Sequence, residues 1–120
     1  MVSCEFVGGR TWHVVETFTV ETRYGKVTVK HCFFHDRYTF APNLTEELPA
    51  IVHDWLRQER KFDDGSSCTL RQSDIVLRDL IVRYNAKLVL GWITISSRRV
   101  APIYYFFVRC ASIWGGLFNG

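Results

Sequence analysis

The feature that most constrains this chain is a change in the spacing of its apolar residues near residue 43. Before that point, residues 11–40 are rich in valine, threonine and aromatic residues and alternate apolar with polar, as in Lys26-Val27-Thr28-Val29-Lys30. Such alternation is typical of strands with one solvated face. After it, apolar residues recur at the three- and four-residue spacings of amphipathic helices. The pattern predicts an α+β fold, with an N-terminal antiparallel hairpin or small sheet followed by about three packed helices.

The first predicted helix begins between residues 44 and 49 and ends at the turn-forming residues 62–67. Asn43 and Glu46 have the spacing of a capping box, and Pro49 suits the first turn of a helix. Its predicted core stripe consists of Leu48, Val52, Trp55 and Leu56.

The second predicted helix runs from Thr69, which forms a capping box with Gln72, to Tyr84. Its predicted core stripe consists of Leu77, Leu80, Ile81 and Tyr84. The third helix is predicted from Pro102 to Trp114, ending at Gly115-Gly116, with a stripe of Tyr104, Phe107, Val108 and Ala111. Residues 87–96 fit either a strand or a buried connection, because short apolar runs do not distinguish the two.

Composition limits the classes of protein to which the chain can belong. With 120 residues, 48% hydrophobic and 22% charged, it is predicted to form a single folded domain over residues 1–120. The net charge of +3 is scattered, which argues against nucleic-acid binding. The apolar stretch 100–117 is interrupted and too short to span a membrane. The four cysteines are far apart and start no CxxC motif, so we expect reduced thiols rather than a zinc site or a disulfide framework.

The polar residues His53, Asp54 and Asp74 need an explanation because they lie beside apolar stripes. Neighbours in a helix point about 100° apart, so His53 and Asp54 are expected to flank the stripe on different sides. Asp74 falls at the edge of a buried stripe, where a carboxylate must be paired or hydrogen-bonded. One interpretation is structural, with Asp74 bonded near Thr69 or to an arginine. The other is functional, with Asp74 meeting His53 or Asp54 across the helix pair.

Asp36 lies in a polar loop ahead of the first predicted helix, where cleft-lining residues are common. If Asp36 converged with His53, Asp54 and Asp74, the group would suit a divalent cation, with Asp36, His53 and Asp54 as ligands. The same group could instead contain a general base that activates water.

The run AIVHDWL, followed by TLRQSDIVLRDLIV and APIYYFFVR, resembles a family of small phage and prophage proteins whose domain has no assigned function. The resemblance covers roughly residues 27–115 and implies that His53, Asp54 and Asp74 are the family's characteristic polar positions. It also implies that Asp36 matches an aspartate ahead of a turn of small residues, a turn that differs here. A fainter resemblance, to secreted phospholipases with a His-Asp pair on a helix, lacks their calcium loop and bracketing cysteines.

Three functions remain as hypotheses. The first is a phage-encoded accessory or virion-associated protein, in the host cytoplasm or the virion, that binds a viral or host protein through aromatic residues. The second is a small hydrolase, with or without a metal ion, in which His53, Asp54 and Asp74 are the catalytic residues. The third, and the weakest, is a nucleic-acid binder that uses Arg98, Arg99 and Arg109.

Overall fold

The computed structural model describes residues 4–8, 11–14, 16–31, 33–35 and 43–119. Its strands are β1 (Cys4–Gly8), β2 (Thr11–Val14), β3 (Phe18–Thr22), β4 (Gly25–Val29), β5 (Phe34–His35), β6 (Leu88–Leu90) and β7 (Ile93–Ile95). Its helices are α1 (Leu48–Glu59), α2 (Leu70–Arg83) and α3 (Ser97–Asn119). The predicted α+β class is confirmed, with antiparallel strands first and helices after them.

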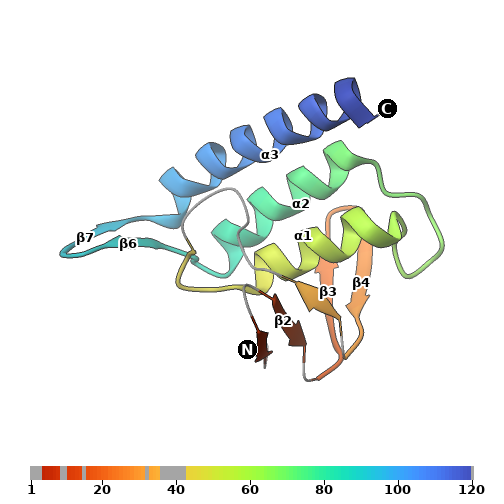
Figure 1. The fold of residues 1–120 in the computed structure, drawn as a ribbon, viewed down its shortest axis with the longest axis horizontal. Coiled ribbons are helices and arrows are strands. Elements are labelled where there is room, and N and C mark those ends of the chain that lie inside the picture. The colour runs from red at the N-terminus through yellow and green to blue at the C-terminus, as the bar shows by residue number, and fades with distance from the viewer. Residues whose placement is uncertain (1–3, 9–10, 15, 32, 36–42, 120) are drawn as a thin grey trace.

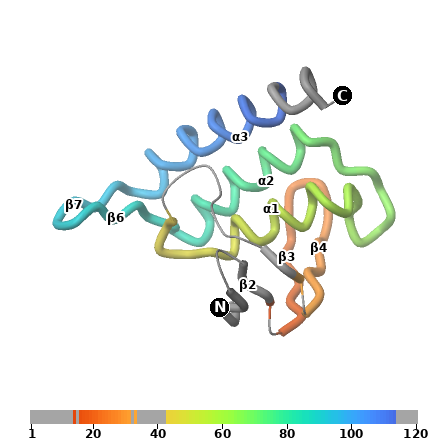
Figure 2. The backbone as a smooth tube through the Cα atoms, in the orientation of Figure 1, coloured from red at the N-terminus to blue at the C-terminus, as the bar shows by residue number. Residues whose placement is uncertain are grey.

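The helices lie side by side in the order α1, α2, α3, and the β3–β4 hairpin packs against α1 (Figure 1). Strands β1, β2 and β5 form a second antiparallel sheet in the order β1-β2-β5. Strands β6 and β7 pair only with each other among the described strands. Figure 2 shows the resulting β6–β7 hairpin extending beyond the helices.

The first part of the core joins the strands to α1. Val27 and Val29 of β4 are fully buried, as their alternation with polar neighbours predicted, and they share a cluster with Ile51, Val52 and Leu56 of α1. Each such side chain contributes about 1.5–3 kcal/mol of hydrophobic stabilisation when it leaves water. This cluster fixes one face of α1 on the hairpin.

The second part of the core joins the helices to one another. Ala50 of α1 packs in a cluster with Leu77 and Ile81 of α2 and with Tyr104 and Val108 of α3. Helix α1 is thus covered on two sides, by strands and by helices. This double coverage explains why His53, predicted to flank the stripe, is itself buried with 5% exposure.

The beginnings of α1 and α2 test the predicted caps. Thr69 and Gln72 form the predicted capping box, with Thr69 Oγ1 accepting from the Gln72 amide and Gln72 Oε1 accepting from the Thr69 amide, each at 3.0 Å. The cap predicted at Asn43 is wrong, because the N-cap residue is Glu47 and it makes no side-chain cap bond. Pro49 lies in the first turn, as predicted.

Helix α3 is longer than predicted at both ends. It begins at Ser97, so Pro102 lies inside the helix instead of starting it, and it continues past the glycine pair to Asn119. The amides of Arg99 and Val100 donate to the Ser96 carbonyl, which sets the earlier start. The ambiguous segment 87–96 is the β6–β7 hairpin, in which Gly91 adopts a φ of 60° that a two-residue hairpin loop requires.

The predicted core stripes are largely confirmed, with two errors. Tyr84 is 40% exposed and Phe107 is 45% exposed, so neither belongs to the core. Tyr84 is the C-cap residue of α2, so it lies at the end of the helix, beyond the part of the stripe that the core covers. In the described part of the chain, no helix combines the length and the apolar character needed to cross a membrane.

Candidate functional site

The predicted polar residues His53 and Asp74 meet in a buried network between the helices. His53 follows Ala50 by three residues on α1 and therefore shares the side of α1 that faces the second core cluster. Asp74, fully buried on α2, accepts a hydrogen bond from His53 Nε2 at 2.7 Å. The contact of Asp74 with His53 across the helix pair, expected under the functional interpretation, is therefore present.

The arginine partner of the structural interpretation is present as well. Arg109 Nη1 donates to Asp74 Oδ2 at 3.0 Å, and the Ser112 hydroxyl donates to the same oxygen at 3.1 Å. Arg109 and Ser112 are three residues apart on α3, so both reach the same point. Arg57 Nη1 lies 3.4 Å from the Ser112 oxygen and extends the network back to α1.

The charges in this network favour a neutral His53. Burial lowers the pKa of His53 below its ordinary value, and this effect outweighs the hydrogen bond and charge of Asp74, which raise it. Arg57 also lowers this pKa through its positive charge. Because a carboxylate only accepts hydrogen bonds, we assign the proton of neutral His53 to Nε2. The negative charge of Asp74 is then balanced by the positive charge of Arg109, so a protonated His53 is not needed.

Asp54 does not join this network through a hydrogen bond to the imidazole. Its Oδ1 lies 3.9 Å from His53 Nδ1, which is beyond hydrogen-bond distance. Asp36, the remaining predicted metal ligand, lies outside the described residues. Within the described ranges, no group of three or more histidine, cysteine, aspartate or glutamate side chains is arranged to hold a metal ion.

Arg109 and Ser112 are the site residues that sequence reasoning missed. Arg109 is predicted as a nucleic-acid contact and is the last residue of the APIYYFFVR motif, and in the structure it lies on α3 one residue after buried Val108. The useful signal was the buried position of Asp74, which required a positive partner. Nothing local in the sequence selected Arg109, because 35 residues separate it from Asp74.

A second feature of interest is a set of exposed apolar side chains on the β6–β7 hairpin and on α3, together called the α3–hairpin surface. Its side chains are Val89, Leu90, Trp92 and Ile93 on the hairpin, and Ile103, Phe106, Phe107 and Ile113 on α3. Trp92 is 93% exposed at the hairpin loop, and Phe106 is 63% exposed beside Phe107. The side chain of Trp114, the predicted end of the third helix, lies outside the described part of the chain.

Comparisons of the chain with models of protein families, with curated proteins and with solved structures found no match. The resemblance to a phage family thus remains an expectation from the quoted sequence motifs alone. The functional inference therefore rests on the geometry of the site.

Proposed function

We propose that the protein acts by binding another protein through the α3–hairpin surface. The observation that carries this proposal is the exposure of Trp92 and Phe106, at 93% and 63%. Large exposed aromatic side chains are costly to leave in water and are enriched at the centres of protein interfaces. The resemblance of residues 27–115 to a phage family further supports a phage-encoded accessory or virion-associated protein whose partner is viral or from the host.

The buried network supports this function indirectly, because its geometry is that of a helix-packing device. His53 Nε2 is bonded to Asp74, and the ring is 5% exposed, so neither a substrate nor a lytic water has ready access to it. Asp74 joins α2 to α1 through His53 and to α3 through Arg109. The network therefore orders the helices that present the surface.

The proposal is tested by a pull-down experiment. The wild type and its variants are immobilised separately, and the proteins that each one retains are compared. Phe106→Ser and Trp92→Ser remove anchors of the surface, whereas Gln58→Ala removes an exposed side chain on α1. We expect proteins retained by the wild type and by Gln58→Ala to be depleted about tenfold or more with either surface variant. Equal retention of the same proteins by all four chains would contradict the proposal.

Hydrolysis is the second candidate function, and the 2.7 Å contact between His53 and Asp74 favours it. A carboxylate that holds one imidazole nitrogen leaves the other to act as a base. The candidate requires the Nδ1 side of His53, next to Asp54, to open to a substrate. Hydrolysis of aryl esters or aryl phosphates by the wild type, with or without Mg²⁺ or Ca²⁺, would support it if a folded His53→Ala variant loses the activity.

The nucleic-acid hypothesis is weakened by the position of Arg109, which is engaged with Asp74 in the part-buried network. Arg98 and Arg99 remain exposed at the start of α3. Two neighbouring arginines provide few phosphate contacts, and affinity for nucleic acid rises with the number of such contacts. We therefore rank this function below the other two.

A further inference from the structure

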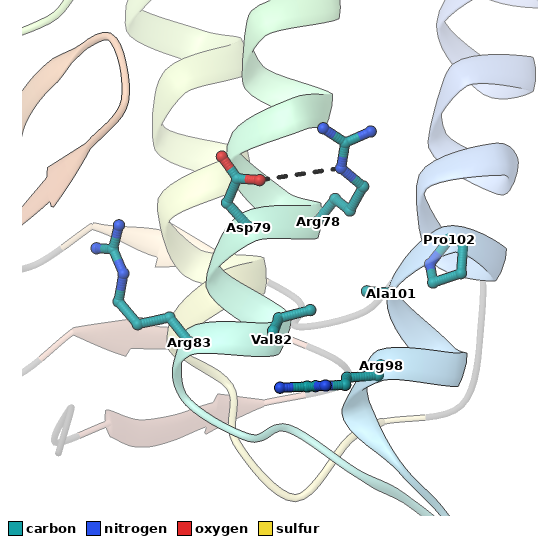
Figure 3. A pocket seen from close by; sticks show the side chains of 7 residues that line it. All are labelled: Arg78, Asp79, Val82, Arg83, Arg98, Ala101 and Pro102. Carbon is teal, nitrogen blue, oxygen red and sulfur yellow. Dashed lines mark ion pairs between the residues drawn. The ribbon is translucent and has the colours of Figure 1, made fainter.

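A cavity of about 580 Å³ lies between α2 and α3, apart from the buried network. Its lining is Arg78, Asp79, Val82 and Arg83 from α2, and Arg98, Ala101 and Pro102 from α3. Figure 3 shows these residues, with the Arg98 side chain extending from α3 toward α2 and Val82. The volume falls within the range of about 300–1,000 Å³ that is typical of small-molecule sites.

The charge around this cavity is positive. Its carboxylate, Asp79, is already paired, since Arg23 donates to both of its oxygens at 2.6 and 2.8 Å. Arg83 donates to the backbone carbonyl of Glu21, a neutral group that does not offset its positive charge. Arg78 lies over the Tyr105 ring, with its guanidinium carbon 4.9 Å from the ring centroid.

Arg98 is the arginine most available to a ligand. It forms no ion pair with any carboxylate in the described part of the chain, and it is exposed at the start of α3. An arginine guanidinium binds a carboxylate or phosphate through two parallel hydrogen bonds, which makes it suited to an anionic group.

The cavity also has an apolar side, formed by Val82, Ala101 and Pro102. A fully ionic ligand such as inorganic phosphate would leave the exposed side chains of Val82 and Pro102 in water. A ligand with both an anionic group and an apolar ring or chain would satisfy both parts of the lining.

We propose that the cavity between α2 and α3 binds a small organic anion, with Arg98 holding its carboxylate or phosphate group and Val82, Ala101 and Pro102 contacting its apolar body. Arg78 and Arg83 add positive potential that draws the anion toward the cavity. This site is independent of the protein-binding function proposed for the α3–hairpin surface.

The test is a titration of the protein, followed by amide NMR signals, with phenyl phosphate, benzoate and inorganic phosphate as separate probes. We expect at least one aromatic anion to shift the Val82 and Ala101 signals to saturation, and inorganic phosphate to bind more weakly than phenyl phosphate. The tighter of the two aromatic anions identifies the preferred anionic group.

Arg98→Ala and Arg99→Ala provide a matched pair, because each removes one arginine from the same exposed turn and only Arg98 lines the cavity. We expect Arg98→Ala to raise the Kd for the tighter aromatic anion about tenfold or more, and Arg99→Ala to change it less than about twofold. The proposal is overturned by the absence of saturable shifts with both aromatic anions. Equal losses in the two variants, or inorganic phosphate binding as tightly as phenyl phosphate, would also overturn it.

Discussion

At the scale of single residues, Asp74 holds the buried network together. It is fully buried and accepts hydrogen bonds from His53, Arg109 and Ser112. A buried carboxylate with this many partners is stable only while they remain, because an unpaired charge is costly to bury. Arg109 in turn depends on Asp74, because its part-buried positive charge would lose its partner if Asp74 were replaced.

Replacing Asp74 with Asn is expected to lower the free energy of unfolding by about 2–4 kcal/mol. The amide keeps the shape of the side chain but leaves the Arg109 charge without its counterion. Glu59→Gln is the control, since it makes the same carboxylate-to-amide change at an exposed position of α1, and it should cost less than about 1 kcal/mol. Urea denaturation followed by circular dichroism measures both values, and similar losses in the two variants would contradict the role given to Asp74.

The lowered pKa of His53 predicts how stability depends on pH. Below the ordinary histidine pKa of about 6.5, the unfolded chain binds a proton at this residue and the folded chain resists it. Stability should therefore be full above that pH and fall as the pH decreases, by up to about 1.4 kcal/mol per pH unit from this residue. A His53→Gln variant should lack this component below pH 6.5, and parallel pH profiles for the two proteins would refute the prediction.

At the scale of the elements, α1 is the helix with two buried faces. Ile51, Val52 and Leu56 face the strands, while Ala50 and His53 face the other helices. The sequence predicted the face of α1 that packs against the strands, because the apolar residues of that face form a wide stripe. It did not predict that the second face is also covered, because a histidine beside a stripe is equally compatible with a solvated edge.

The N-terminus of α2 offers a direct test of local sequence signals. Thr69→Ala is expected to cost about 1 kcal/mol in stability, because the Gln72 amide loses its acceptor. Gln72→Ala removes the reciprocal bond, so the double variant should lose less than the sum of the single losses. Strictly additive losses in urea denaturation would show that the two bonds act independently.

The ends of the elements show where sequence signals were sufficient. The box at Thr69 was read correctly because both partners lie within four residues. The predicted start of α3 at Pro102 is five residues late, because the helix begins at Ser97 and has this proline inside it. The segment 87–96 fits either a strand or a buried connection by sequence, because a short apolar run does not distinguish the two, and it contains the β6–β7 hairpin.

At the scale of the whole molecule, the strands and helices share a core through α1 and α2. The α+β class followed from the change in apolar spacing, since that change is a property of the whole chain. The pairing of His53 with Asp74 was one of two open interpretations, and the contribution of Arg109 was not foreseen. Contacts between distant segments depend on helix packing, which one sequence does not specify at the level of single residues.

The shared core predicts that a defect in α1 destabilises the entire domain. Leu56→Ala, at a fully buried position, should lower the unfolding free energy by about 2–5 kcal/mol and leave a single transition. Leu90→Ala makes the same substitution at a 49% exposed hairpin position and should cost less than about 1 kcal/mol. Transitions that differ between circular dichroism and tryptophan fluorescence would show that the strands and helices unfold separately.

An NMR titration of the imidazole nitrogens of His53 measures whether this side chain belongs to a closed packing network. We expect the pKa of His53 to lie below the ordinary histidine value of about 6.5, and its Nε2 proton to be protected from solvent exchange by Asp74. An imidazole that titrates at the ordinary pKa and exchanges its Nε2 proton rapidly would contradict the account. That result would show a network open to water and would favour the hydrolase.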